Sequence, residues 1–349
     1  MELELGHHVT PPNAKRPTAK QVAALAKVSP ITVSRTLSGG KNVRADVQKR
    51  VFDAIEQLGY LRNESARTIR PGQRSGLIGV VITNIGNPYY GQFALGVERI
   101  AAERGRKIIL GNTGEEIDRE RQLVGAFVGQ QAEGLIVVPA GASEMKARHL
   151  ESNRVGGIPV VLASRTIEDL ETDTVLLEDF EGAYTATSDL IMSGHSRIAF
   201  VGNVLSVSTA RQRRDGFLTA LRDGGVDPQP EYMAAGQLNS QSAKDRAKLL
   251  LKTSPPPTAI FCANNRNAIG VLQAISELGP LDPMPTVVSF DDLELASLLP
   301  MPMLVVSHDP AELGSIAAQL LFDRIDGIVT GAPRTLRLPV SVYPSGKRG

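Results

Sequence analysis

The chain is poor in several residue types, and each shortage excludes a class of protein. Its 349 residues contain one cysteine, Cys262, and no tryptophan. A single cysteine can form neither a disulfide framework within the chain nor a multi-cysteine metal site. No run of 18 apolar residues occurs, so no transmembrane helix is predicted. Residues 1–14 lack the apolar core and cleavage site of a secretory signal, so we expect a disordered tail there and a cytoplasmic protein.

The remaining composition is that of an ordinary globular protein, but its charge is unevenly distributed. Hydrophobic residues make up 42% of the chain and charged residues 21%, and the length suits about two domains with room for a small third module. Residues 1–75 hold 13 Lys and Arg against 6 Asp and Glu, whereas the rest holds 25 against 31. A basic head on an acidic body indicates a polyanion such as nucleic acid as partner of the head, or a merely solvated charge bias.

Three helical patterns follow one another between residues 15 and 62. Thr18 is a candidate N-cap of the first, and Ser29-Pro30 predicts the start of the second, because serine caps helices and proline suits the first helical position. Two glycines end the second pattern, and a third runs from 45 to 58 with Gly59 as its stop. Two short helices joined by a tight turn and braced by a third describe a helix-turn-helix unit.

The second helix of such a unit carries the residues that can read DNA. Its N-terminal residues meet base edges in the major groove. Arg35 can donate two hydrogen bonds to guanine O6 and N7, whereas Pro30 and Ile31 can contact thymine methyl groups or sense shape. The hydroxyl residues suited to phosphate oxygens are Ser29, Thr32 and Ser34. The same pattern also fits a small packing module with solvated outward charges.

Beyond residue 76 the pattern changes to short apolar runs that alternate with amphipathic stretches. The runs are 77–82, 107–110, 134–138, 159–163, 174–177, 197–201, 258–262, 286–290 and 304–306, and helical stretches include 93–104 and 119–131. This alternation predicts βαβ units with parallel sheets whose strands are buried on both faces. Because nine or more strands exceed one compact sheet, we expect two α/β subdomains.

No signature of an enzyme is present. The chain has no Gly-x-Gly-x-x-Gly after a strand, no phosphate-binding loop and no nucleophile elbow. Apart from the adjacent pair His7-His8 in the tail, the histidines show no metal-ligand spacing. His195 precedes a predicted strand and is interpreted as structural. We therefore predict no catalytic residue, no metal site and no cofactor.

The head resembles a known family. Segments 21–37 and 54–63, together with Asn42-Val43, are similar to the head of the LacI/PurR (lactose- and purine-repressor) family of transcription regulators. The pattern Val-Ser-x-x-Thr-Val-Ser-Arg at 28–35 is highly specific to that family. The similarity continues into the body and covers nearly the whole chain.

The resemblance implies a set of DNA contacts and a hinge at residues 63–75. The implied contacts are Thr18, Ser29, Pro30, Ile31, Thr32, Ser34, Arg35, Asn42, Val43, Asn63, Arg67, Ile69 and Arg70. The family folds the hinge into a short helix on DNA and wedges a leucine into the minor groove, where this chain has the stiffer Ile69 between two arginines suited to phosphates. A second departure is Lys27, at a turn position that usually holds glycine. A positive φ there would cost about 1 kcal/mol, or the lysine could add a phosphate contact.

The body resembles the family's effector domain, which is similar to periplasmic sugar-binding proteins. The resemblance implies two α/β lobes over residues 76–345, joined by three crossovers, with a cleft at the carboxyl ends of the strands. Lobe one maps to 76–162 plus 309–336, and lobe two to 163–308 plus 337–345.

Six residues of the body are implied to contact a small-molecule effector. They are Tyr89, Tyr90, Ser164, Arg213, Asn265 and Asp291, with both tyrosines placed in the loop after the first strand. Each also has a structural interpretation: a tyrosine in the core, Arg213 in a surface or lobe–lobe salt bridge, Asp291 as a helix N-cap. Ser164 and Asn265 stand where the family often has carboxylates, which suggests a phosphorylated or acidic sugar.

The sequence thus predicts a DNA-binding transcription regulator, a repressor, whose operator binding a sugar or sugar derivative controls. The resemblance implies a homodimer on an inverted-repeat operator in double-stranded DNA, with no membrane partner. The alternative is a solute receptor with an α/β clamp that does not bind DNA. Such a receptor would leave the basic head unexplained.

Overall fold

The computed structural model describes residues 17–37, 39–40, 42–60, 75–141, 147–294 and 296–345. The chain divides into two compact units, a head within 1–73 and a body within 74–349, and each is described by itself. The tail at 1–14 and all but residue 75 of the predicted hinge lie outside the described residues. No helix in the described part of the chain is long and apolar enough to cross a membrane.

The described part of the head consists of three helices, as predicted: α1 (Ala19–Leu25), α2 (Pro30–Leu37) and α3 (Ala45–Leu58). Their ends follow local chemistry. The Thr18 N–H donates to Gln21 Oε1 at 2.8 Å and the Gln21 N–H donates back to Thr18 Oγ1, which caps α1 reciprocally. Gly59 ends α3 with a φ of 60°. Val22, Val33 and Val51, one from each helix, are fully buried in a common core.

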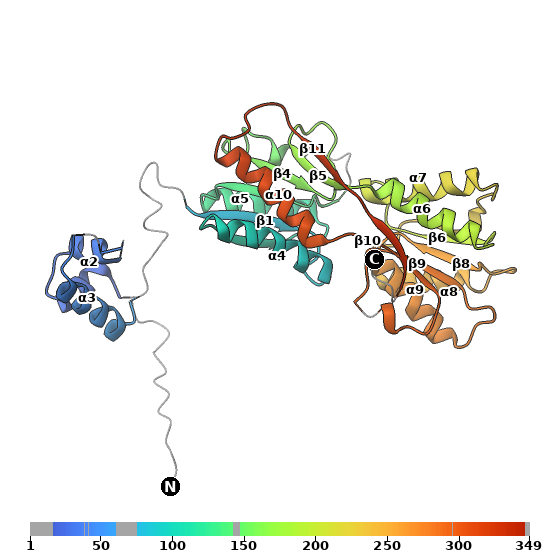
Figure 1. Ribbon diagram of the computed structural model, residues 1–349, viewed down its shortest axis with the longest axis horizontal. Coiled ribbons are helices and arrows are strands. Elements are labelled where there is room, and N and C mark those ends of the chain that lie inside the picture. Colours follow the sequence, from blue (N-terminus) through green and yellow to red (C-terminus); the bar gives the residue numbers. More distant parts are fainter. Residues whose placement is uncertain are drawn as a thin grey trace, which may run out of the picture. The chain divides into compact units, whose positions relative to one another are not determined.

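The body contains two six-stranded sheets (Figure 1). The first sheet comprises β1 (Leu77–Ile82), β2 (Lys107–Asn112), β3 (Gly134–Val137), β4 (Val160–Ala163), β5 (Asp173–Leu177) and β11 (Thr335–Leu338). The second comprises β6 (Ile198–Val201), β7 (Met233–Ala234), β8 (Ala259–Cys262), β9 (Thr286–Phe290), β10 (Met303–Ser307) and β12 (Ser341–Pro344). Their orders are β11-β5-β4-β3-β1-β2 and β12-β10-β9-β8-β6-β7. All pairs are parallel except β10 with β12.

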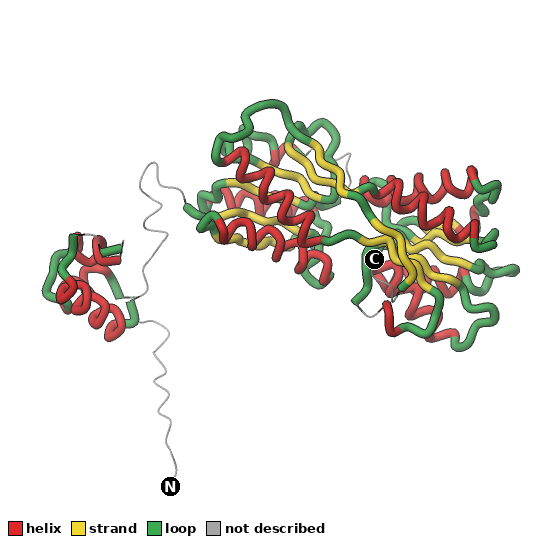
Figure 2. Tube along the Cα trace, in the orientation of Figure 1, coloured by secondary structure: helices red, strands yellow, loops and turns green. Residues whose placement is uncertain are grey.

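Helices cover both faces of each sheet. They are α4 (Pro88–Glu103), α5 (Ile117–Gly129), α6 (Asp179–Met192), α7 (Ser208–Asp223), α8 (Ser240–Leu250), α9 (Asn265–Leu278) and α10 (Pro310–Ile325), with short 3₁₀ turns η2 (Arg148–Leu150), η3 (Pro230–Tyr232) and η4 (Ala296–Leu298). In the first lobe α4 and α10 lie side by side on one face of the sheet and α5 covers the other (Figure 2). In the second lobe α6 and α7 cover one face, and α8 and α9 the other.

Two glycines allow α4 and α10 to pack closely. A Cβ on Gly96 would lie 1.9 Å from the Ala311 carbonyl oxygen, and one on Gly314 would lie 2.1 Å from the Phe93 carbonyl oxygen. Both distances are far below van der Waals contact, so any larger residue would push the helices apart. This pair therefore fixes the N-terminal end of α4, which carries cleft residues, against the start of α10.

The predicted lobe boundaries are wrong at two places. β5 pairs with β4 and with β11, so the whole of 173–177 belongs to the first sheet rather than to lobe two. The strand 335–338 also lies entirely in the first sheet. The chain crosses between lobes three times, after β5, after β10 and after β11. An apolar run shows that a strand forms, but its hydrogen-bonding neighbour is decided by tertiary packing.

Other details of the body also differ from the predictions. β2 is not buried on both faces, because it is an edge strand with Lys107 exposed. Strands β7, β11 and β12 were not predicted. Helix α4 begins at Pro88 rather than at residue 93, since the Asn87 side chain caps it by accepting from the Tyr89 N–H at 3.2 Å. Tyr89 and Tyr90 therefore lie in the first turn of a helix and not in a loop.

Candidate functional site

The head presents most of the predicted DNA-contact residues on exposed positions. Ile31 is 64% exposed, and Thr18, Ser29, Pro30, Ser34, Arg35 and Asn42 are also exposed, while Thr32 and Val43 are half-buried. The Ser29 hydroxyl accepts from the Thr32 N–H at 3.2 Å and thereby caps α2. Asn63, Arg67, Ile69 and Arg70 lie outside the described residues.

The turn between α1 and α2 contains a strained lysine. Lys27 has a φ of 55°. Its N–H donates to the Ala24 carbonyl at 3.3 Å, and the Val28 N–H donates to the Ala23 carbonyl at 2.9 Å. These two bonds form the pattern that ends many helices with a left-handed residue, which is most often glycine. A lysine in that conformation costs about 1 kcal/mol relative to glycine.

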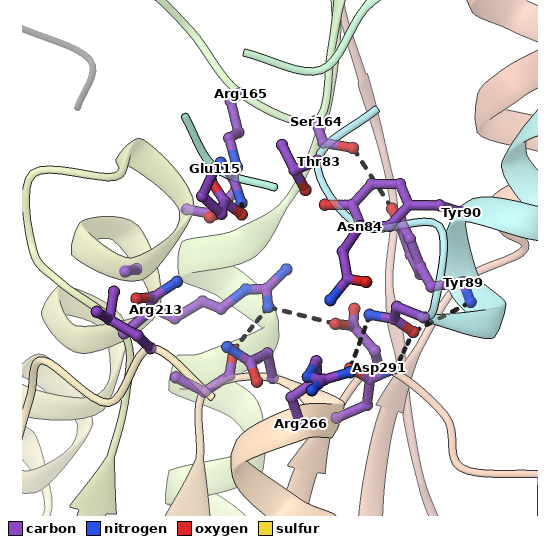
Figure 3. A pocket seen from close by; sticks show the side chains of 18 residues that line it. Thr83, Asn84, Tyr89, Tyr90, Glu115, Ser164, Arg165, Arg213, Arg266 and Asp291 are labelled. Atoms are coloured by element: carbon purple, nitrogen blue, oxygen red, sulfur yellow. Dashed lines mark hydrogen bonds and ion pairs between the residues drawn. The ribbon is translucent and has the colours of Figure 1, made fainter. Parts of the chain in front are cut away.

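The body has a cavity of about 110 Å³ between its lobes, and all six predicted effector contacts line it (Figure 3). It lies where β1, β4, β6, β8 and β9 end, as expected for open α/β sheets. Its lining from the first lobe includes Thr83, Asn84, Tyr89, Tyr90, Glu115, Ser164 and Arg165. Its lining from the second includes Asn203, Arg213, Asn264, Asn265, Arg266 and Asp291.

Arg213 is held by two carboxylates of its own lobe. Its Nε donates to Asp179 Oδ1 at 2.7 Å, its Nη1 donates to the Ala263 carbonyl at 2.6 Å, and Nη1 lies 3.6 Å from Asp291 Oδ2. The guanidinium also lies 3.6 Å from the centroid of the Phe290 ring. Because both acidic partners belong to the second lobe, the lobe–lobe salt-bridge interpretation of Arg213 is wrong.

Asp179 is a site residue that the sequence did not indicate. Its side chain is 6% exposed and that of Arg213 is 8% exposed. Burial raises the pKa of Asp179 to about 6, and the guanidinium of Arg213 offsets only part of that rise. The Arg213 guanidinium therefore forms ion pairs with two carboxylates, Asp179 and Asp291, in a site largely shielded from water.

Asp291 and Ser164 both have left-handed backbone conformations, with φ of 68° and 64°. Residues with a β-carbon rarely adopt this conformation, and such strain gathers at ligand sites. Asp291 does not cap a helix, because the next helical turn along the described chain starts at Ala296. Its Oδ1 is buried and has no hydrogen-bond partner in the described protein.

The two tyrosines have different roles in the packing. Tyr90 is 8% exposed and belongs to the core of the first lobe while also lining the cavity. The Tyr89 hydroxyl lies 3.1 Å from His308 Nε2 and 3.4 Å from Ser164 Oγ. Burial lowers the pKa of His308 to about 4, so this histidine is neutral near pH 7. His308 lies in the second crossover between the lobes. The Tyr89–His308 hydrogen bond therefore connects a residue that lines the effector cavity with a segment that joins the two lobes.

Asn265 uses its amide to join the lobes. Asn87 Nδ2 donates to Asn265 Oδ1 at 3.1 Å, and Asn265 Nδ2 donates to Asn87 Oδ1 at 2.9 Å. Both residues are at most 9% exposed. They lie at the N-terminal ends of α4 and α9, which belong to different lobes. This reciprocal pair, here called the amide latch, closes one wall of the cavity.

A second ion pair in the cavity was also missed. Arg165 donates to both carboxylate oxygens of Glu115, at 2.7 and 2.8 Å, and to the Pro139 carbonyl at 2.9 Å. Burial alone would raise the pKa of Glu115, but the bidentate Arg165 lowers it below its usual value. The signal available in the sequence was position: Arg165 directly follows Ser164 at the end of a strand. Its partner, 50 residues earlier, was not indicated.

The head and the cleft together define the class of this protein: a DNA-binding regulator with a small-molecule site between two lobes. Residues 18–63 match the family described as bacterial regulatory proteins, lacI family. Residues 75–343 match the family of periplasmic binding proteins and the sugar binding domain of the LacI family. The chain belongs to the LacI family, whose members are transcriptional regulators rather than enzymes.

Individual relatives agree with this assignment. The HTH-type transcriptional repressor PurR of Actinobacillus pleuropneumoniae serotype 3 (strain JL03) is 30% identical over 309 residues, which cover 88% of this chain and 91% of that protein. The transcriptional regulator CelR in its cellobiose complex is 26% identical, with a TM-score of 0.69 over 95% of this chain and 100% of that one. The lac repressor dimer bound to operator has the same fold, with a TM-score of 0.78, 23% identity and coverage of 95% and 99%.

Proposed function

We propose that this chain is a cytoplasmic repressor that binds an inverted-repeat operator as a homodimer. A sugar or sugar derivative in the cleft changes its affinity for that operator. The dimer is supported by the lac repressor dimer, whose fold this chain shares. Large apolar side chains are also exposed on each lobe, among them Leu95 (58%) on α4 and Leu298 (75%) on η4. Two heads related by two-fold symmetry require an operator of the same symmetry.

Within each head, we assign base recognition to the exposed face of α2. Arg35 is the exposed residue of this helix that can pair bidentately with guanine. Arg35→Ala is expected to weaken operator binding by about 1–3 kcal/mol and to relax specificity at one base pair per half-site. Equal weakening on every sequence, measured by competition among operator variants, would mean that Arg35 contacts only phosphate.

One unpaired oxygen in the cavity carries the effector proposal. Asp291 Oδ1 is buried, lines the cavity and has no hydrogen-bond partner in the described protein. Buried polar atoms are almost always paired, so a ligand bearing a hydroxyl group would satisfy it. Hydroxyls can donate to the carboxylate of Asp291 and accept from the guanidinium of Arg213, which is the chemistry of sugar recognition.

The proposal of an acidic group on the effector rests on Arg266, because the three carboxylates and three arginines of the cleft balance in charge. Glu115 is neutralised by Arg165, and Asp179 and Asp291 share Arg213. Arg266 also lines the cavity and has no carboxylate within ion-pair distance among the described residues. A phosphate or carboxylate on the sugar would therefore meet an uncommitted cation.

Calorimetric titration of hexoses and their monophosphates tests this charge preference. The phosphate of a preferred sugar should bind more tightly than the neutral sugar, and Arg266→Gln should remove that difference. Tighter binding of the neutral sugar to the wild type would contradict the acidic-effector assignment without affecting the repressor assignment.

The repressor assignment itself is tested by selecting bound fragments from the source organism's genomic DNA. Enrichment of an inverted repeat is expected, and adding the effector should change its recovery, because an effector controls DNA binding only if its affinity differs between the two states. Absence of enrichment, with and without a panel of sugars and purines, would overturn the proposal.

A further inference from the structure

Lys27 occupies a backbone position that favours glycine. It is the first residue beyond the C-cap of α1, and its φ of 55° lies in the left-handed region. The two hydrogen bonds that close the turn are made by backbone atoms only, so they hold whatever side chain stands there. Glycine would meet this geometry without steric strain. The fold of the turn therefore gives no reason for a lysine.

The Lys27 side chain has no partner inside the head to offset that strain. It is exposed and makes no hydrogen bond or ion pair with any residue that the structure describes. A cation beyond the C-terminus of α1 gains some attraction from the helix dipole. That attraction is modest here, because α1 has seven residues and the lysine is solvated.

The location of the turn supplies a partner outside the protein. In a helix-turn-helix the first helix crosses the DNA backbone, while the N-terminal end of the second enters the major groove. The turn joins the C-terminal end of the first helix to the N-terminal end of the second. It therefore lies beside the phosphates of one strand. Lys27 is exposed and lies two residues before Ser29, the cap of α2, so its flexible side chain starts close to the end of α2 that enters the groove in this kind of unit.

We propose that Lys27 binds a DNA backbone phosphate. This contact offsets the cost of placing a lysine in the left-handed conformation of the turn. This inference rests on the proposed DNA-binding function. It assigns Lys27 an electrostatic, sequence-independent role, distinct from base reading by Arg35. Each such contact releases a counterion, so it appears in the salt dependence of binding.

Full-length wild type and four variants, K27G, K27Q, K27R and K49Q, test the proposal on a random-sequence DNA duplex. No operator needs to be known, because phosphate contacts persist on nonspecific DNA. Affinity is measured between about 50 and 200 mM salt, where the slope of log K against log salt should fall by about 0.9 per head in K27G and K27Q. K27R should keep the wild-type slope. Lys49 is an exposed lysine of α3, so K49Q removes the same charge elsewhere in the head and controls for the general field.

Hydrogen exchange of the head amides in the same full-length proteins gives the second readout. K27G should slow exchange about fivefold, because about 1 kcal/mol of strain is relieved, whereas K27Q keeps the strain and should not. A lysine that merely neutralised the dipole of α1 would leave every slope unchanged. An unchanged slope in K27G, or an equal fall in K49Q, would overturn the proposal. A wild type that binds the duplex without salt dependence would instead overturn the DNA-binding function itself.

Discussion

Replacing Arg213 by methionine should destabilise the body, since it leaves Asp179 buried without its counter-ion. A pH of 7 is about one unit above the folded-state pKa of Asp179, which is about 6. Protonating the carboxyl, so that no buried charge is left unpaired in the variant, therefore costs about 1.4 kcal/mol at pH 7. The charged hydrogen bond to the Ala263 carbonyl and the stacking on Phe290 are lost as well, each worth about 1 kcal/mol or more. The expected loss is about 3 kcal/mol, at the lower end of what breaking a buried ion pair costs.

Thermal and urea unfolding of the full-length protein measure this effect. For a body of this size, a loss of about 3 kcal/mol corresponds to a fall in Tm of about 6–12 °C. The matched control is Arg214→Met, because Arg214 pairs with Asp215 at the surface, where ion pairs contribute little. That control should cost less than about 0.5 kcal/mol.

A double variant separates the carboxylate from the other contacts. D179N/R213M removes the orphaned charge. Without Arg213 the pKa of folded Asp179 is no lower than about 6, against 3.8 in the unfolded chain, so at pH 7 the double variant should be more stable than R213M by about 3 kcal/mol or more. The gap should shrink to about 1.6 kcal/mol at pH 5 and close below pH 3.8, where the carboxyl is protonated in both states. A double variant less stable than R213M at pH 7, or a gap that stays constant from pH 7 to pH 4, would refute the argument.

Two further predictions concern pH and closure of the lobes. The folded-state pKa of Asp179 is raised from 3.8 to about 6, so its contribution to stability is full below pH 3.8 and is lost as the pH rises through 6. Between pH 4 and pH 7 the wild type should therefore lose about 2–3 kcal/mol of unfolding free energy relative to Asp179→Asn, in urea titrations across that range. Asn265→Ala removes both hydrogen bonds of the amide latch, so the free energy that favours the closed lobes should fall by about 1–3 kcal/mol. The open arrangement should then be seen as a longer distance between spin labels placed on the two lobes. Gln273→Ala on the exposed face of α9 is the control, and an unchanged distance in both variants would mean that the latch does not hold the lobes.

Features that depend on neighbouring residues could be predicted from the sequence. The three head helices form where capping residues and glycine stops fall beside a helical period, and these signals act over three or four residues. Most strands formed where short apolar runs lie between amphipathic stretches. The family resemblance implied that Ser164 and Asp291 contact the effector, although they are 127 positions apart, and the rule that parallel strands end at one edge of the sheet explains why both lie at the cleft.

Partner choice over long sequence distances was decided only by the tertiary structure. The sequence analysis named Arg213 but not Asp179, and Asn265 without its reciprocal partner 178 residues away, and it named neither Arg165 nor Glu115. A charged or amide side chain accepts many partners, and the packing of the sheets selects one of them. The same reason explains the misplaced strand 173–177, whose composition suits either sheet and whose membership depends on which neighbour its backbone meets. The sequence by itself therefore determined the family, the local elements and six of the eighteen positions that line the cleft, whereas the fold decided how the charges in that cleft are paired.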